Sequence, residues 1–194
     1  MQEKYTVLKK YFGHNAFRGG QETVVDHLLN REDVLCVMPT GAGKSICYQT
    51  PAMIFVGITL VISPLISLMH DQVMALVQTG IPAAYINGML TPSQCGQVLR
   101  NMACGKYKLI YVAPERLENP EFLAACARAS VSFVAVDEAH CVSQWGQDFR
   151  PGYRRIADFI DRLPSRPVVG AFTATATDAV KADIISLLKL HEPF

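Results

Sequence analysis

The stretch Val34-Leu-Cys-Val-Met-Pro-Thr-Gly-Ala-Gly-Lys-Ser-Ile46 decides the fold of this chain. Its first residues, 34–38, form a short continuous apolar run, which predicts a strand buried on both faces. A loop of small residues follows, and a helix is predicted from residue 44 to residue 53. Backbone N–H groups of such a loop, at the amino terminus of a helix, form a nest for an anion. The stretch therefore predicts a phosphate-binding loop at one end of a sheet.

Strand and helix candidates alternate along the rest of the chain. Further apolar runs predict strands at residues 58–62, 83–86, 109–112, 131–136 and 168–172. Helices are predicted at residues 65–78, 92–104, 121–129, 153–163 and 178–190, and one more precedes the first strand at residues 17–29. This alternation predicts an α/β fold, a doubly wound and mainly parallel sheet with helices on both faces. At this length the whole range 1–194 is expected to be one domain.

Composition narrows the class of protein. The net charge is only +1, so the protein as a whole does not attract nucleic acid through an excess of positive charge. Any nucleic-acid-binding surface must therefore be a local one. Six cysteines without a C-x-x-C pair favour reduced thiols, as in a cytoplasmic protein, over disulfides or a zinc site. The longest apolar run, residues 58–62, is far too short to span a bilayer, and the amino terminus has no apolar signal region. A membrane partner is therefore not expected.

The phosphate-binding loop has the chemistry of an ATP site. Its small residues leave room for phosphate oxygens beside the backbone. Lys44 can reach the β- and γ-phosphates, and the hydroxyl of Ser45 can ligate Mg²⁺. We therefore expect ATP and Mg²⁺ as cofactors, with the nucleotide contacted by Thr40, Gly41, Ala42, Gly43, Lys44 and Ser45.

A pair of acids, Asp137 and Glu138, follows the apolar run at residues 131–136. Asp137 suits the shell of a Mg²⁺ ion, and Glu138 suits the positioning of a water against a phosphate. His140, three residues past Asp137, is expected to couple this site to a second one. The predicted catalytic residues are Lys44, Asp137, Glu138 and His140, and the predicted metal ligands are Ser45 and Asp137.

Aromatic, amide and basic side chains follow within a dozen residues: Gln144, Trp145, Phe149 and Arg150. Trp145 is the only tryptophan in the chain. Nucleotide hydrolysis needs no such cluster, whereas base stacking and phosphate pairing are natural uses of it. We expect this aromatic loop, residues 143–150, to sense a nucleic acid and to communicate with the nucleotide site.

Over about residues 8–190, these motifs resemble the RecQ family of superfamily 2 DNA helicases. The resemblance rests on Pro39-Thr-Gly-Ala-Gly-Lys-Ser45, Asp137-Glu-Ala-His140 and Cys141-Val-Ser-Gln-Trp-Gly-Gln-Asp-Phe-Arg-Pro151. It implies the first RecA-like domain of an ATP-dependent helicase with 3'-5' polarity, which couples ATP hydrolysis to DNA unwinding. The implied partner is single-stranded or duplex-junction DNA, in the cytoplasm and nucleoid of a bacterium or in a eukaryotic nucleus.

The resemblance implies a base-recognition motif in Phe17-Arg-Gly-Gly-Gln21. Gln21 would pair with the edge of the adenine, and Arg18 would pack on the base. His14 stands where family members often place an aromatic ring, and an imidazole can still stack on the adenine there.

The resemblance also implies contacts with the DNA backbone and a linking motif. Ser63 and Pro64 open one segment that resembles a strand-holding motif, and Arg116 closes another, Ala113-Pro-Glu-Arg116. Thr173 and Thr175 would supply hydroxyls that link hydrolysis to strand separation. The predicted DNA-binding and coupling set consists of these residues together with Gln144, Trp145, Phe149 and Arg150.

Two differences from the family pattern bear on activity. Gln147 occupies a place in the aromatic loop where family members commonly carry a histidine, and a glutamine cannot take up a second proton. The resemblance also implies a second RecA-like domain with an arginine finger, a zinc subdomain and a winged helix, and none of these has a counterpart in residues 1–194. The chain alone is therefore expected to hydrolyse ATP feebly and not to unwind DNA.

Other classes of protein share parts of this pattern. A DEAH-type RNA helicase would carry the same two boxes but need not carry the aromatic loop. A nucleotide-gated module would bind DNA or protein without useful turnover. A small-molecule kinase would share the phosphate-binding loop, but no substrate lid is evident and the acidic pair continues into His140.

Overall fold

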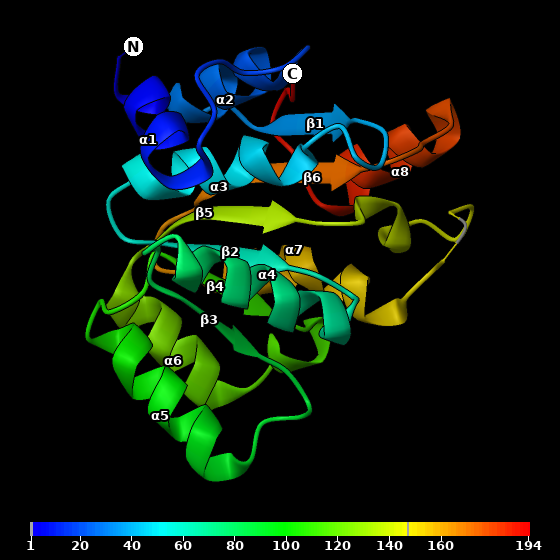
Figure 1. Cartoon of the computed structure of the whole chain (residues 1–194). Helices are drawn as coiled ribbons and strands as arrows, with labels where there is room; N and C mark the ends of the chain where they lie inside the picture. Colours follow the sequence, from blue (N-terminus) through cyan, green and yellow to red (C-terminus); the bar gives the residue numbers. More distant parts are fainter. Residues whose placement is uncertain (1, 147) are drawn as a thin grey trace.

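The structure is a computed structural model that describes residues 2–146 and 148–194. Within these residues, the strands form one sheet in the order β1-β6-β5-β2-β4-β3, and every neighbouring pair is parallel (Figure 1). The predicted α/β fold with a mainly parallel sheet is therefore confirmed. The strands are β1 (Val34–Val37), β2 (Ile58–Ile62), β3 (Ala83–Ile86), β4 (Leu109–Val112), β5 (Val131–Val136) and β6 (Val168–Thr173).

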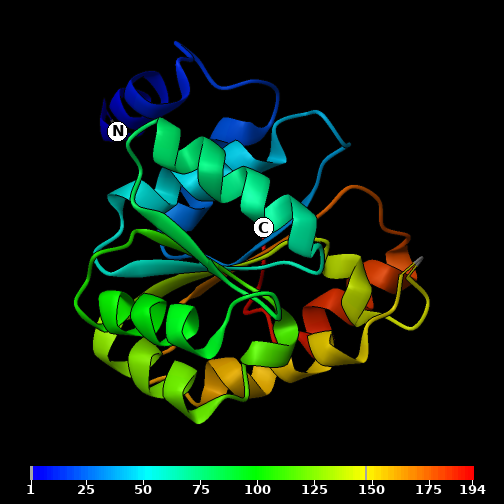
Figure 2. The same cartoon turned by 60° about the horizontal axis from the view of Figure 1, so that its bottom comes forward.

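Helices cover both faces of the sheet. Figure 2 shows α1 to α4 on one side of the strands and α5 to α8 on the other. No helix among the described residues combines the length and apolar character needed to cross a bilayer. The helices are α1 (Gln2–Phe12), α2 (Gln21–Leu29), α3 (Lys44–Ile54), α4 (Ile66–Gln78), α5 (Pro92–Ala103), α6 (Pro120–Ala129), α7 (Ile156–Asp161) and α8 (Asp178–Leu187), with short 3₁₀ helices η1 (Pro114–Arg116), η2 (Ala139–Val142) and η3 (Pro151–Arg155).

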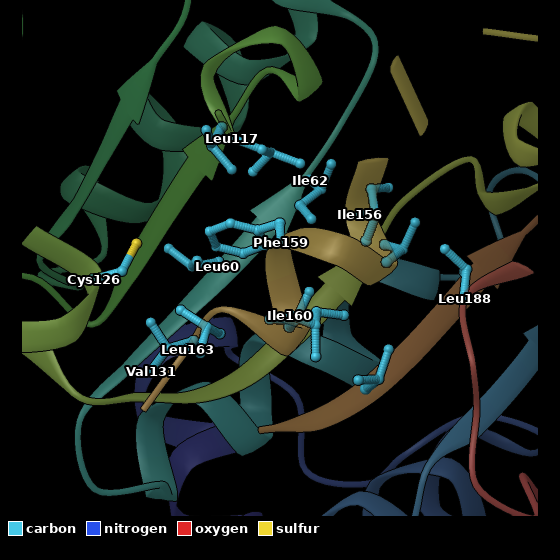
Figure 3. Close-up of a cluster of buried hydrophobic side chains, with 14 of the residues drawn as sticks. Leu60, Ile62, Leu117, Cys126, Val131, Ile156, Phe159, Ile160, Leu163 and Leu188 are labelled. Atoms are coloured by element: carbon cyan, nitrogen blue, oxygen red, sulfur yellow. The ribbon is translucent and has the colours of Figure 1, made fainter. Parts of the chain in front are cut away.

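A separate hydrophobic core lies on each face of the sheet. Every residue of β2, β4 and β6 is buried, as expected for strands that are covered on both faces. On the α5–α8 side, Phe159 of α7 lies with Leu60 and Ile62 of β2 (Figure 3), and its ring stacks on that of Phe122 at 5.8 Å. Burying a side chain of this size is worth about 1.5–3 kcal/mol, so these contacts hold α6 and α7 on the sheet.

Some helical segments differ from the sequence prediction. The helix predicted at residues 17–29 begins only at Gln21, because the preceding residues form a turn. In that turn the Gln21 N–H donates to the Arg18 carbonyl (2.9 Å), and Gly20 has a positive φ of 75°. The helix predicted at residues 153–163 starts within the 3₁₀ helix η3 and becomes α-helical only in α7. α1 was not predicted, because most of its side chains are polar and few of them are buried.

The carboxyl ends of the strands meet at one edge of the sheet. The register pairs Val37 with Thr173, and pairs Ile62 with both Val136 and Val112. Because the strands are parallel, the segments that follow β1, β2, β4, β5 and β6 all emerge at this edge. These segments contain most of the predicted site residues, so the fold itself brings them together.

Candidate nucleotide and nucleic-acid site

The phosphate-binding loop connects the end of β1 to the start of α3. Gly41 and Gly43 have positive φ values of 83° and 79°, a conformation that costs other residues about 1–2 kcal/mol. α3 begins at Lys44, and the N–H groups of a first helical turn lack partners within the helix. Thr40 and Gly41 are exposed, and residues 42–45 are half-buried. The loop therefore has the backbone geometry of an anion nest, with its rim open to solvent.

Gln21 ties the amino-terminal segment to the phosphate-binding loop. Its buried side chain accepts from the Arg18 N–H (2.8 Å) and donates through Nε2 to the carbonyls of Ala42 (2.9 Å) and Gly43 (3.2 Å). A β-carbon on Gly43 would stand 2.5 Å from Nε2, so this contact needs a glycine. Sequence reasoning missed the link between Gln21 and the phosphate-binding loop.

The predicted pairing of Gln21 with adenine stays a prediction. Donation from Nε2 to the base would require Nε2 to give up its hydrogen bond to one of the two carbonyls. His14 and Arg18 are both exposed.

Lys44 lies against both predicted acids. Its Nζ is 3.4 Å from Glu138 Oε1 and 3.7 Å from Asp137 Oδ1, although Lys44 and Glu138 are 94 positions apart in the sequence. Burial raises the pKa of the Asp137 carboxyl above its ordinary value, while the Lys44 ammonium acts in the opposite direction. A negative charge on Asp137 is therefore costly unless a cation stands beside it.

The backbone at Glu138 is left-handed, with φ 47° and ψ 47°. Such a conformation costs on the order of 1–3 kcal/mol in a non-glycine residue and persists only when neighbours hold it. Here the Glu138 N–H donates to Asp137 Oδ1 (3.1 Å), and the Tyr153 hydroxyl donates to the Asp137 carbonyl (2.9 Å). The turn places the Glu138 carboxylate between Lys44 and His140, whose Nδ1 is 3.4 Å from Glu138 Oε2.

His140 is joined to Thr173 at the end of β6. The Thr173 hydroxyl donates its one hydrogen to the Thr175 carbonyl (3.0 Å), so its oxygen accepts from the His140 Nδ1–H (2.9 Å). This assignment leaves Nε2 of a neutral ring as the acceptor. The structure therefore links Glu138, His140 and Thr173 in one chain of polar contacts. Thr175 joins that chain through its backbone carbonyl, and the residue itself is exposed.

The aromatic loop projects from the same edge of the sheet. Trp145 is 79% exposed, and its neighbour Gln144 is exposed too. Phe149 lies under the guanidinium of Arg154, whose central carbon is 5.3 Å from the ring centre. Gln147 lies outside the described residues. An exposed indole at a turn is available for stacking on a base.

Two arginines at this edge are each held by a backbone carbonyl. Arg150 donates to the Pro64 carbonyl (2.9 Å) and to the Asp148 carboxylate (3.0 and 2.8 Å), and that carboxylate raises the pKa of the guanidinium. Arg116 donates to the carbonyl of Asn87 (2.9 Å). Arg150 thereby joins the aromatic loop to the segment after β2. Sequence reasoning missed the contacts of Arg150 with Pro64 and of Arg116 with Asn87, since the local pattern does not show which distant group each arginine meets. It also missed Asp148, although that residue lies only two positions before Arg150.

A groove of about 340 Å³ runs between the segments that follow β2, β4 and η2. Ser63, one residue before the groove begins, is only 2% exposed, so its predicted contact with a DNA strand stays a prediction. The groove is lined by two members of the predicted DNA-binding set, Pro64 and Arg150. Its lining includes Pro64, Ala113, Pro114, Arg150 and Arg155.

Known proteins match this chain over nearly its whole length. The profile of the DEAD/DEAH box helicases matches residues 18–183. The chain belongs to this family. It is 48% identical over 188 residues to the ATP-dependent DNA helicase RecQ of Bacillus subtilis (strain 168), which covers 96% of this chain and 32% of that protein. The RecQ of Pasteurella multocida (strain Pm70) is 47% identical over 192 residues, 99% of this chain and 30% of the relative.

A eukaryotic relative, the ATP-dependent helicase wrn-1 of Caenorhabditis elegans, is 44% identical over 197 residues, 99% of this chain and 18% of the relative. The resemblance to RecQ helicases is therefore confirmed for this DEAD/DEAH box domain. The chain spans about a third of the length of the bacterial relatives it matches.

Solved helicase structures have the same fold. A hypothetical ATP-dependent RNA helicase from Sulfolobus tokodaii superposes with a TM-score of 0.76 at 19% identity, over 100% of this DEAD/DEAH box chain and 56% of that one. The Hef helicase domain of Pyrococcus furiosus superposes with a TM-score of 0.67 at 23% identity, over 88% and 36% of the two chains. At these identities the likeness establishes a RecA-like helicase fold and leaves the substrate to other observations.

Proposed function

We propose that this chain is the ATP- and DNA-binding motor domain of a RecQ-type DNA helicase. One observation carries the proposal. At a single sheet edge the Lys44 ammonium meets two acids, and His140 connects that cluster to a loop with an exposed Trp145. The proposed nucleotide site and nucleic-acid surface would thus share one short segment. Relatives named ATP-dependent DNA helicase RecQ support ATP and DNA as the ligands.

The donor set at the acid pair suits Mg²⁺, which prefers oxygen ligands. The Ser45 hydroxyl and the Asp137 carboxylate would hold the ion. Ser45 follows Lys44, whose ammonium already lies 3.7 Å from Asp137. The raised pKa of buried Asp137 fits such a site, because a bound cation offsets the cost of burying the charge. When bound, Mg²⁺ would neutralise negative charge on the phosphate oxygens.

The nucleotide would compete with the acids for Lys44. Phosphate oxygens in the nest would draw the ammonium away from Glu138, which it now meets at 3.4 Å. Glu138 would then be free to accept a hydrogen bond from the attacking water and to orient it. Because Glu138 also lies 3.4 Å from His140 Nδ1, this exchange would alter the contacts of His140 with Thr173.

Single-stranded DNA would bind along the aromatic loop and the neighbouring groove. Trp145 would stack on a base, a contact worth about 1–3 kcal/mol. Arg150 already bonds to Pro64 and Asp148, so we assign it to shaping the groove as well as to pairing with a phosphate. The net charge of +1 supplies little long-range attraction, so affinity would rest on these local contacts.

We further propose that a second RecA-like domain, with zinc and winged-helix domains beyond it, completes the motor. The bacterial relatives are about three times as long as the stretch they share with this chain. An arginine supplied by another domain is typically worth ~10³–10⁵ in the rate of phosphoryl transfer. The complete protein would unwind DNA with 3'-5' polarity, in the nucleoid of a bacterium or a eukaryotic nucleus.

Stimulation of ATP hydrolysis by different polymers tests this proposal. The full-length protein should hydrolyse ATP much faster with single-stranded DNA than with RNA or with no polymer. Glu138→Gln should still bind ATP but hydrolyse it ~10²–10⁴-fold more slowly, because the water loses its orienting base. Equal or greater stimulation by RNA would favour a DEAH-type RNA helicase. ATP-dependent DNA binding without measurable hydrolysis would instead indicate a nucleotide-gated binding module.

A further inference from the structure

Ser143, at the start of the aromatic loop, makes a contact that the nucleotide site does not explain. It is completely buried, and its hydroxyl donates to Asp183 Oδ2 of α8 at 2.6 Å. A hydroxyl–carboxylate bond of this length belongs to the strong, charge-assisted class. The two residues are 40 positions apart, and nothing in the predicted motifs includes Asp183. This contact, between buried Ser143 and half-buried Asp183, fixes the loop to the helix.

The same hydroxyl holds the backbone of Trp145. Its oxygen accepts from the Trp145 N–H at 3.1 Å, and the Gly146 N–H donates to the Ser143 carbonyl, also at 3.1 Å. The turn is pressed against the catalytic segment, since a β-carbon on Gly146 would stand 2.2 Å from the His140 carbonyl oxygen. The backbone of the turn that carries the exposed Trp145 side chain therefore has little conformational freedom.

α8 is also connected to the hydrolysis side of the site. Its amino-terminal cap is Thr177, whose side chain accepts from the Val180 N–H, and Thr177 stands two residues after Thr175. The Thr175 carbonyl accepts from Thr173, the partner of His140. A cavity of about 250 Å³ is lined by both Trp145 and this segment, Thr175 to Thr177, so the two lie on one hollow.

From this geometry we propose that Asp183 is a positioning residue for DNA sensing. Through Ser143 it fixes the backbone at Trp145, and through the start of α8 it joins any displacement of that turn to the Thr173–His140 contact. The inference rests on the proposed function for its DNA and ATP readouts, but the structural link from Asp183 to Trp145 can be measured without either ligand.

Trp145 is its own probe, because it is the only tryptophan in the chain. The time-resolved fluorescence anisotropy of Trp145 should contain, in the wild-type chain, overall tumbling and a fast component from the exposed indole. Asp183→Ala and Ser143→Ala should each enlarge the fast component, because the backbone of the turn gains freedom. Adding Asp183→Ala to Ser143→Ala should change nothing further, because the loss of the Ser143 hydroxyl already removes its contact with Asp183. Asp183→Asn keeps an acceptor oxygen and should restore most of the slow decay. Asp178→Asn is the matched control, since Asp178 lies on α8 but its carboxylate pairs with Lys181 on the same helix and not with the described residues of the aromatic loop.

The second readout is the DNA stimulation of ATP hydrolysis in the full-length protein, taken as the ratio of rates with and without oligothymidine. Asp183→Ala and Ser143→Ala should lower this ratio about tenfold, and Asp183→Asn should recover it. An unchanged anisotropy decay in both single variants would overturn the proposal, as would a ratio no lower than that of Asp178→Asn. If the wild type itself shows neither ATP binding nor DNA stimulation, the proposed function fails, and the anisotropy result still decides the link to Trp145.

Discussion

Asp137 is a buried carboxylate at the end of an apolar strand, and burial makes its ionisation costly. Its pKa in the folded state lies above the ordinary value because burial outweighs the attraction of Lys44. Between the ordinary and the raised pKa the folded state binds more protons than the unfolded state. The free energy of unfolding contributed by this group therefore falls as pH rises through that interval, opposite to the usual behaviour of aspartate.

Asp137→Asn removes this titration and so isolates it. The stability of the Asn variant relative to wild type should increase from a pH below the ordinary aspartate pKa to a pH above the raised one, because only the wild type acquires the buried charge. Urea unfolding at a series of pH values without Mg²⁺ measures this difference. A stability difference that stays the same across the interval would contradict the assignment.

Two glycines of the phosphate-binding loop provide a matched comparison. Gly41 and Gly43 have similar positive φ values, but among the described residues a β-carbon would meet nothing within 4 Å at Gly41 and the Gln21 amide at 2.5 Å at Gly43. Each alanine variant should lose about 1–2 kcal/mol of unfolding free energy through its backbone. Gly43→Ala should lose about 1–3 kcal/mol more, because buried Gln21 loses its partners. Urea unfolding measures both losses, and equal values would show that the Gln21 contact contributes nothing.

At the scale of elements, the aromatic loop is where the proposed DNA sensing can be tested separately from nucleotide binding. Trp145→Ala should weaken single-stranded DNA binding about 5- to 150-fold, the equivalent of one stacked base at about 1–3 kcal/mol. Its affinity for ATP should stay that of the wild type, because the indole is 79% exposed and follows β5 and η2, whereas the phosphate-binding loop follows β1.

Binding of labelled oligothymidine and of ATP, each measured separately, checks this prediction. Val56→Ala is the control, since Val56 is 84% exposed between α3 and β2, at the opposite edge of the sheet. Loss of ATP affinity to the same extent as DNA affinity in Trp145→Ala would mean that the tryptophan supports the fold and does not contact DNA.

The elements of this fold were predictable to the extent that their signals are local. The strand, loop and helix around Lys44, and the acid pair after β5, follow from neighbouring residues, and the parallel strands then bring them to one edge. The contacts of Gln21 with the loop and of Ser143 with Asp183 were not predictable, because they depend on which strands and helices become neighbours. α1 was not predicted for a related reason: its sequence is mostly polar, and its packing against α3 supports the helix.

At the scale of the whole molecule, the strand order decides where ligands can bind. β6 lies between β1 and β5, so the phosphate-binding loop and the acid pair flank the end of β6 from either side. In open parallel sheets, ligands bind in the crevice beyond the carboxyl ends of the strands. The same edge carries the aromatic loop and the groove, so the proposed nucleotide site and the proposed nucleic-acid surface would lie side by side in one domain.

The chain of residues 1–194 should not unwind DNA by itself. Strand separation in a motor of this type needs a second domain that moves against the first, and rapid hydrolysis needs an arginine worth ~10³–10⁵ in rate. A fluorescent tailed duplex should therefore remain intact with this chain and ATP, while the full-length protein separates it. Unwinding by residues 1–194 at the rate of the full-length protein would contradict the proposed division of labour between domains.

Calorimetric titration of ATP with Mg²⁺ onto this chain tests the central claim most directly. The wild type should bind, and Lys44→Ala should bind at least about tenfold more weakly, because an ammonium–phosphate contact is worth more than 1.4 kcal/mol. Lys108→Ala is the matched control: Lys108 is another partly buried lysine, which donates to the Phe55 carbonyl at the opposite edge of the sheet. Equal ATP affinity in wild type and Lys44→Ala, with both proteins folded, would contradict the assignment of this edge as a nucleotide site.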